Sequence, residues 1–235
     1  MINDGLTTTT TTTTTTTITN ISTATMGPSR RIYSCDYVTD FLRRILYHNE
    51  AYLTTILVCS TREHFLEQLV AAILSPAEGN AASEGPQFLT KTIGLLSQSS
   101  KIKLVFCPSL ENLRAYISVL SMASTKPQSN RRPLLGVLNP LALHRSTSEF
   151  SAQGLSRTLA AAVEVTARQG VNLVLCECLD AMDGEREPLW SVQVPLLNQT
   201  ARIGADESTG RGGNVTVKRV VQRWFEFEED NRMIY

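Results

Sequence analysis

The segment from Arg131 to Cys178 constrains the fold more than any other part of the chain. It contains a short apolar run, a polar loop, an amphipathic segment of helical length and a second apolar run. That order predicts strand, loop, helix and strand. A helix that connects two neighbouring strands implies that the strands are parallel and that the crossover is right-handed. The segment therefore predicts an α/β protein built on a parallel sheet.

The same unit of strand, turn and helix recurs earlier in the chain. Apolar runs at residues 53–59 and 101–107 predict two more buried strands. Segments 62–74 and 110–122 follow these runs with apolar residues at helical spacing, and segment 33–52 predicts an amphipathic helix before the first run. Repetition of this unit is typical of a doubly wound α/β sheet.

After Cys178 the pattern changes to two β-rich runs. Residues 190–198 and 215–227 are separated by a glycine-rich loop, which predicts an antiparallel hairpin that extends the sheet. Residues 179–189, just before the hairpin, form a predicted acidic loop.

Eleven consecutive threonines, Thr7 to Thr17, lie near the beginning of the sequence. Such a tract has too little apolar surface to offset the entropy of ordering it. We therefore predict a disordered tail over 1–29, a single domain over 30–228 and a frayed C-terminus over 229–235. A mitochondrial presequence is the alternative for the tail, but its arginines are not spread along an amphipathic helix.

Composition bounds the location and the partners of the protein. The 235-residue chain has a formal net charge of zero, which argues against bulk attraction to nucleic acid or to an anionic membrane, although a local basic face remains open. No apolar run approaches the ~18 residues that span a bilayer. The five cysteines lie mostly in or beside apolar runs, as free thiols do in a reducing compartment. We expect no membrane partner, and the nucleus or the cytoplasm as the location.

No cofactor and no metal site are expected from the motifs. Cys176 and Cys178 are one residue apart, which is not a zinc-ligand spacing, and no second Cys/His pair stands near them. Cys59 and His64 flank a predicted strand-to-helix turn, where they could form a Cys–His nucleophile. A buried thiol beside a solvent-facing histidine is the simpler interpretation.

A polar loop with a histidine follows the apolar run at 134–138. His144 and Arg145 begin this loop, at the carboxyl edge where open α/β sheets bind their ligands. It is the best short candidate for a functional loop, and a small α/β enzyme that uses it is one alternative. The other is that Ser148 caps the next helix.

Basic residues gather around aromatic ones in the predicted hairpin. This mixture can bind phosphates and stack on bases, and Trp and Arg are also common hot-spot residues of protein interfaces. On a strand, Arg219 and Arg223 would share one face and Lys218 and Trp224 the other, so neither face is purely basic. The candidate residues for binding nucleic acid or a partner are His144, Arg145, Arg202, Arg211, Lys218, Arg219, Arg223 and Trp224.

The order of predicted elements resembles the RecA-like core of recombinases and their paralogues. In that family a first strand leads to the Walker A loop, a later strand ends in the Walker B acid, and a crossover helix and an antiparallel hairpin follow. The resemblance implies a three-layer α/β/α fold with a mostly parallel sheet, over about residues 50–228. The corresponding segments are Ile56–Cys59, Leu134–Leu138, Gln153–Gln169, Val171–Cys178, Trp190–Asn198 and Val215–Phe227.

Residues needed for ATP chemistry are absent from the matching positions. A Walker A loop needs glycines, whose amides wrap phosphate, and a lysine, yet no glycine occurs from Pro28 to Glu78. The strand at 134–138 ends in Asn139 where the Walker B acid would stand, and an amide brings no negative charge to Mg²⁺. The sequence thus predicts no hydrolysis and a degenerate nucleotide site at Ser60, Thr61, Arg62 and Asn139.

The recombinase paralogues include the small subunits of Shu-type complexes, which lack Walker motifs. This resemblance implies a non-catalytic subunit that pairs with another RecA-like subunit and assists homologous recombination on single-stranded DNA. A subunit of the Elongator RecA-like ring, which serves transfer-RNA modification, would show the same pattern and is the main alternative.

Overall fold

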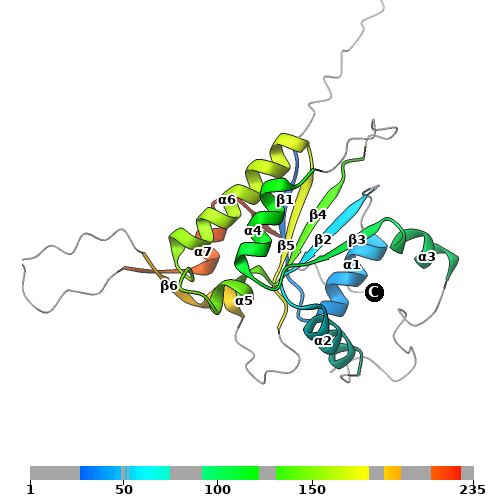
Figure 1. Cartoon of the computed structure of the whole chain (residues 1–235), viewed down its shortest axis with the longest axis horizontal. Coiled ribbons are helices and arrows are strands. Elements are labelled where there is room, and N and C mark those ends of the chain that lie inside the picture. The colour runs from blue at the N-terminus through cyan, green and yellow to red at the C-terminus, as the bar shows by residue number, and fades with distance from the viewer. Residues whose placement is uncertain are drawn as a thin grey trace, which may run out of the picture.

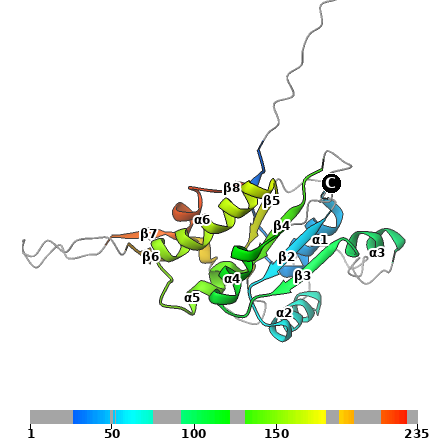
Figure 2. The ribbon, with the colours of Figure 1, turned by 45° about the horizontal axis from the view of Figure 1, so that its top comes forward.

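Six strands form one parallel sheet in the computed structural model, which describes residues 27–48, 51, 53–74, 92–121, 131–179, 188–196 and 213–228. The strand order is β3-β2-β4-β5-β1-β8, and each neighbouring pair is parallel (Figure 1, Figure 2). The strands of this sheet are β1 (Arg30–Tyr33), β2 (Thr54–Val58), β3 (Ile102–Phe106), β4 (Leu134–Leu138), β5 (Asn172–Cys176) and β8 (Glu226–Glu228).

Helices cover both faces of the sheet and so complete three layers (Figure 1). Helices α1 and α2 pack on one face, for example through Phe41 and Phe65, whereas α4, α6 and α7 pack on the other. Successive residues of a strand point to opposite faces, so Ile56 and Leu57 of β2 belong to different cores. The helices are α1 (Val38–His48), α2 (Arg62–Leu74), α3 (Ile93–Ser99), α4 (Leu110–Val119), α5 (Pro140–Arg145), α6 (Ala152–Gln169), α7 (Val217–Val221) and the 3₁₀ turn η2 (Leu189–Ser191).

Local sequence fixes both ends of the crossover helix α6. Ser151 is its N-cap, and the side chain accepts a hydrogen bond of 3.1 Å from the N–H of Gly154. The helix stops at Gly170, whose φ of 68° lies in the left-handed region. Gly154 itself is packed against the carbonyl of Glu149, where an added Cβ would lie 2.1 Å from the oxygen. The start of α6 is therefore held tightly against the turn that precedes it.

The predicted fold class is confirmed. The structure has a mostly parallel sheet between two helical layers and a small antiparallel hairpin. The predicted strand and helix segments contain β2, α2, β3 and α4, and the segment from Arg131 to Cys178 contains β4, α6 and β5. The hairpin consists of β6 (Gln193–Pro195) and β7 (Asn214–Thr216), which form a separate two-stranded sheet and do not join the main one.

The beginning of the domain differs from the prediction of a helix over 33–52. Residues Arg30–Tyr33 form β1, which lies between β5 and β8, and the helix begins only at Val38. In β1 only Ile32 is fully buried, so the strand carries no apolar run that the sequence pattern would show. The strand at 54–58 is therefore the second of the sheet.

Residues 217–221 form a helix, so the prediction of a continuous strand over 215–227 is wrong. Val217, Val220 and Val221 are buried, and their spacing of three and four residues is helical. Because these residues are helical, the prediction that Arg219 and Arg223 share one face of a strand is also wrong. After α7 the chain adds β8 to the main sheet, parallel to β1.

Several predictions concern residues outside the described ranges. These are the tail up to residue 26, the end from 229, most of the acidic loop, and both Arg202 and Arg211. Among the helices that the structure describes, none is long and apolar enough to cross a membrane.

Candidate binding pocket at the carboxyl edge of the sheet

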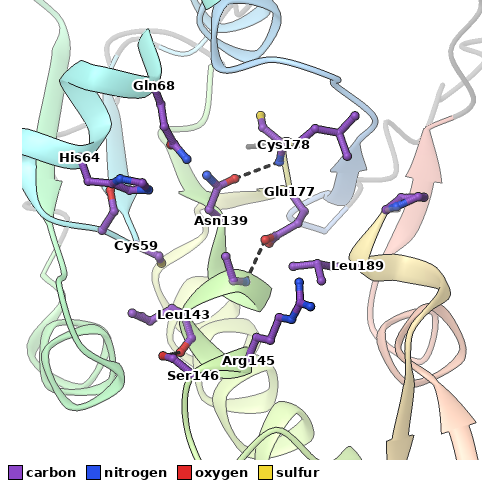
Figure 3. A pocket seen from close by; sticks show the side chains of 14 residues that line it. Cys59, His64, Gln68, Asn139, Leu143, Arg145, Ser146, Glu177, Cys178 and Leu189 are labelled. Carbon is purple, nitrogen blue, oxygen red and sulfur yellow. Dashed lines mark hydrogen bonds between the residues drawn. The ribbon is translucent and has the colours of Figure 1, made fainter. Parts of the chain in front are cut away.

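The connections of β2 and β4 open a crevice at the carboxyl edge of the sheet. The two strands are hydrogen-bonded neighbours, yet β2 continues into α2 on one face and β4 leads through α5 to α6 on the other. Chain segments that diverge in this way leave a space between them, which is where open α/β sheets bind ligands. A pocket of about 550 Å³ lies there (Figure 3).

Asn139 closes β4 and ties it to β5. Its backbone is left-handed, with φ 57° and ψ 43°, a conformation that asparagine tolerates better than most residues. Its N–H donates to the carbonyl of Cys176 at 2.8 Å, and its Oδ1 accepts from the N–H of Cys178 at 2.9 Å. The following Pro140 starts α5. Asn139 is therefore part of the turn itself.

Glu177, which directly follows β5, binds the first turn of α5 through its side chain. Its two carboxyl oxygens accept hydrogen bonds of 2.8 Å from the backbone N–H groups of Leu141 and Ala142. The residue is only 7% exposed. Burial raises the pKa of Glu177 to about 8, although the two backbone hydrogen bonds act in the opposite direction. Near neutral pH the carboxyl group is therefore mostly protonated.

The opposite wall of the pocket comes from β2 and α2. Thr61 accepts a hydrogen bond from the N–H of His64 at 3.2 Å and so caps α2. Burial raises the pKa of the Cys59 thiol well above its ordinary value, which disfavours the thiolate that a Cys–His nucleophile requires. Gln68 is 5% exposed and forms no hydrogen bond with any residue that the structure describes.

The predicted histidine loop is helix α5, and His144 lies on its inner side. The residue is 1% exposed, and its Nε2 lies 3.1 Å from Oγ1 of Thr158 in α6. Arg114 of α4 also donates to that hydroxyl at 3.0 Å and forms an ion pair with Glu149. Burial, assisted by the positive charge of Arg114, lowers the pKa of His144 to about 4. His144 thus packs between helices, whereas Arg145 is exposed and lines the pocket.

The alternative prediction for this loop, that Ser148 caps the next helix, is wrong. Ser151 is the N-cap of α6, because it is the residue that directly precedes the first helical turn and bonds to its backbone. The close approach of Gly154 to Glu149 places residues 147–150 in a turn ahead of that cap.

Positions assigned to a degenerate nucleotide loop follow the second strand of the sheet. Ser60 lines the pocket, Thr61 caps α2, and Arg62 is exposed in the first turn. The loop after the first strand is residues 34–37, and it also contains neither glycine nor lysine. Asn139 and Glu177 both line the pocket and lie close together (Figure 3).

The basic and aromatic candidates lie on and just after α7. Lys218, Arg219 and Arg223 are exposed, whereas Trp224 is half-buried against the core beneath α4 and α6. The Lys218 ammonium lies 5.1 Å from the ring centroid of Phe227, and the Arg223 guanidinium lies 5.5 Å from that of Trp224. The cations therefore cover the rings in this structure.

Two pocket residues, Gln68 and Glu177, escape motif-based prediction. Their signal in the sequence is a polar residue inside an apolar pattern: Gln68 follows Phe65 by three residues on the buried side of α2, and Glu177 stands between two cysteines at the end of β5. A buried polar residue needs a partner or a role. Among the described residues, no group of three or more potential metal ligands is brought together.

Comparisons with known proteins place the chain in a family. No curated protein matches it. Two solved structures are similar at 10% identity: a DnaB-like replicative helicase studied with its interactions with primase, with a TM-score of 0.36 over 68% of this chain, and the ATPase domain of a second protein, with a TM-score of 0.38 over 69%. The chain spans 42% and 63% of those two structures. A family model described as SPAC22G7.03-like matches residues 33–228, and the chain belongs to that family.

Proposed function

We propose that this protein is a non-catalytic subunit with a RecA-like fold, which acts by assembly with another RecA-like subunit in homologous recombination. The observation that carries the proposal is that the side chains of Asn139 and Glu177 are hydrogen-bonded to the backbone of this protein. Both stand at the carboxyl edge of the central strands, and both are bonded to backbone groups of the turn between β4, α5 and β5. Side chains that would serve chemistry in an ATPase serve local structure here.

Phosphoryl transfer requires groups that this edge does not offer. Phosphate is held by glycine-rich backbone and a lysine, and the metal by a carboxylate. The loops after β1 and β2 contain no glycine and no lysine, and the Glu177 carboxyl keeps its proton near neutral pH because burial raises its pKa to about 8. A neutral carboxyl group with both oxygens engaged is a poor Mg²⁺ ligand.

Two surfaces support a role in assembly. Helix α2 exposes Leu66, Val70 and Leu74, which are spaced four residues apart and so form one apolar stripe. Contiguous exposed apolar side chains are typical of surfaces that another protein covers. On and after α7, Lys218, Arg219 and Arg223 present positive charge to solvent, which suits a nucleic-acid backbone.

ATP binding by the purified protein tests the non-catalytic assignment. We expect no retention of a radiolabelled ATP analogue on filters and no Mg²⁺-dependent release of phosphate. The variant Asn139→Asp restores a carboxylate at the end of β4, and we expect it to remain inactive because no lysine accompanies it. Hydrolysis by the natural sequence that an excess of EDTA abolishes would contradict the proposal.

Binding to labelled single-stranded DNA tests the recombination role. We expect a salt-dependent complex that weakens when Arg219 and Arg223 are both changed to Ala, with a salt slope reduced by about 0.7 for each lost phosphate contact. Arg168→Ala, an exposed arginine at the end of α6, is the matched control and should leave binding unchanged. Preference for transfer RNA over single-stranded DNA would instead favour the Elongator-type role.

A further inference from the structure

Gln68 is a polar side chain directed into the pocket without a partner. The residue is 5% exposed, and no described residue forms a hydrogen bond with its amide. Figure 3 shows the side chain reaching from α2 into the pocket toward Asn139. Among the described side-chain atoms that are fully buried without a partner, none belongs to Gln68, so water in the pocket can reach its amide. A ligand that displaces this water must replace its hydrogen bonds.

Asn139 presents a second unused group to the same space. Its Oδ1 is bonded to the N–H of Cys178, whereas its Nδ2 is bonded to none of the residues that the structure describes. In Figure 3 this nitrogen is turned away from Cys178, toward the side on which Gln68 lies. The two amides together offer N–H donors and one free carbonyl acceptor. A ligand that pairs with them needs a donor and an acceptor side by side.

The other lining residues are partly apolar and partly polar. Leu143, Leu179 and Leu189 line the pocket together with the Cys59 thiol, whose raised pKa keeps it neutral, and Ser60, His64, Arg145 and Ser146 line it as well. Glu177 is also mostly neutral near pH 7, because burial raises its pKa to about 8. A space of about 550 Å³ with apolar walls and a few convergent polar groups is typical of sites for small organic molecules.

We propose that this pocket binds a small, uncharged, planar molecule with an amide-type edge, held by the carboxamides of Gln68 and Asn139. Nucleobases and aromatic carboxamides share this edge, and paired amides recognise it through two parallel hydrogen bonds. The apolar side chains would contact the faces of the ring. This binding needs no phosphate and no hydrolysis, so it goes beyond the assembly role and stands independently of it.

The test is a titration of the full chain with two sets of probes at pH 6. Adenosine, guanosine, cytidine and uridine represent the nucleobase source, and nicotinamide represents the carboxamide source. Binding is followed by ligand-observed saturation-transfer NMR and by calorimetry. We expect at least one probe to bind, and Gln68→Leu to weaken it by about tenfold or more, as loss of a buried hydrogen-bond partner does.

Matched variants keep the result decisive. Gln222→Leu changes an exposed glutamine after α7 and should leave binding unchanged. Ser146→Trp places a bulky ring at an exposed lining position, and it should block binding even if Gln68→Leu fails to fold. The proposal is overturned if no probe binds at millimolar concentration, or if both pocket variants bind as the natural sequence does. It is also overturned if ATP binds at least tenfold more tightly than adenosine, because the site would then recognise phosphate through Arg145.

Discussion

The two walls of the pocket treat their buried polar side chains in opposite ways. On the wall from β4 and β5, Asn139 and Glu177 are bonded to backbone groups of neighbouring segments at 2.8 to 2.9 Å. On the wall from α2, Gln68 is as deeply buried but forms no hydrogen bond with a described residue. The carboxyl oxygens of Glu177 and the Oδ1 of Asn139 therefore stabilise the local structure, whereas the Nδ2 of Asn139 and the amide of Gln68 form no hydrogen bond with a described residue.

This difference teaches that burial alone does not identify a functional residue. Glu177, with its strongly raised pKa, has the electrostatic signature of an active-site acid, yet its contacts explain it as a structural link between β5 and α5. Gln68 does not titrate and has no such signature, but its contacts leave it unexplained. The predictions below separate the two kinds of residue by stability and by pH dependence.

The largest effect is expected from removal of the Glu177 carboxyl group. Glu177→Ala leaves the N–H groups of Leu141 and Ala142 without acceptors, and we expect the free energy of unfolding to fall by about 2–4 kcal/mol. Urea denaturation at pH 6 measures this change. Glu226→Ala, at an exposed position of β8, should change stability by less than about 0.5 kcal/mol. A similarly small effect at Glu177 would mean that its link to α5 is dispensable.

Asn139 should be nearly as important, for two separable reasons. Asn139→Ala loses the acceptor for the N–H of Cys178 and places alanine in a left-handed conformation, for a loss of about 2–3 kcal/mol. Asn139→Gly loses the same acceptor but tolerates the positive φ, so it should be less damaging by about 1 kcal/mol in the same denaturation assay. Equal losses in both variants would exclude a contribution from the backbone conformation.

Stability should depend on pH through Glu177 and His144. The pKa of Glu177 rises on folding from 4.5 to about 8, so its unfolded form ionises first and stability falls as pH increases across that range. The pKa of His144 drops on folding from 6.5 to about 4, so stability falls as pH decreases from 6.5 to 4. The two effects cancel between pH 4.5 and 6.5. From pH 6.5 to 8 only Glu177 acts, and we expect a loss of about 2 kcal/mol.

The variant Glu177→Gln isolates the contribution of His144. Without the carboxyl group, stability should rise with pH from 4.5 to 6.5 and then stay level up to pH 8. Thermal unfolding at half-unit steps of pH resolves the two profiles. A decline above pH 6.5 that persists in this variant would show that another group, and not Glu177, titrates there.

The smallest effect is expected at Gln68. Gln68→Leu replaces an unpaired amide by an apolar group of similar size, so we expect stability to be unchanged or to increase by up to about 1 kcal/mol. Phe65→Ala, one turn earlier on the buried side of α2, is the contrasting control and should lose about 3–4 kcal/mol. If Gln68→Leu lowered the free energy of unfolding by more than about 2 kcal/mol, Gln68 would be a structural residue like Asn139 and Glu177. The difference between the two walls would then disappear.

Apolar periodicity was sufficient to predict the central strands and most helices, because β2, β4 and β5 are buried on both faces and form continuous apolar runs. Short elements at the edge of the sheet contain too few buried apolar residues for their periodicity to predict a strand or a helix. Strand β1 buries only Ile32 completely, and α7 is five residues long, with three valines that suit a strand equally well in sequence. Tertiary packing decides such segments.

The sequence predicts where in the fold the candidate site lies, but not which residues line it. The carboxyl edge of β4 follows from the crossover alone, and Asn139 follows from its position at the end of the strand. His144 was a reasonable candidate in sequence, but α5 turns it inward onto Thr158. Gln68 and Glu177 line the same pocket because β2 and β5 flank β4. This arrangement follows from the sheet order and not from any local sequence pattern.

The sheet order also sets when the protein can finish folding during its synthesis. Strand β1 is made first but pairs with β5 and β8, and the contact from Ser29 to Asn172 already spans 143 residues. The last neighbour, β8, is joined to the start of the domain by ion pairs from Arg31 and Arg44 to Glu228. Until β5 leaves the ribosome, β1 has no strand to pair with, and its other edge stays unpaired until β8 follows. The edge of the sheet that contains the beginning of the domain is therefore completed last, and such long-range pairing slows folding.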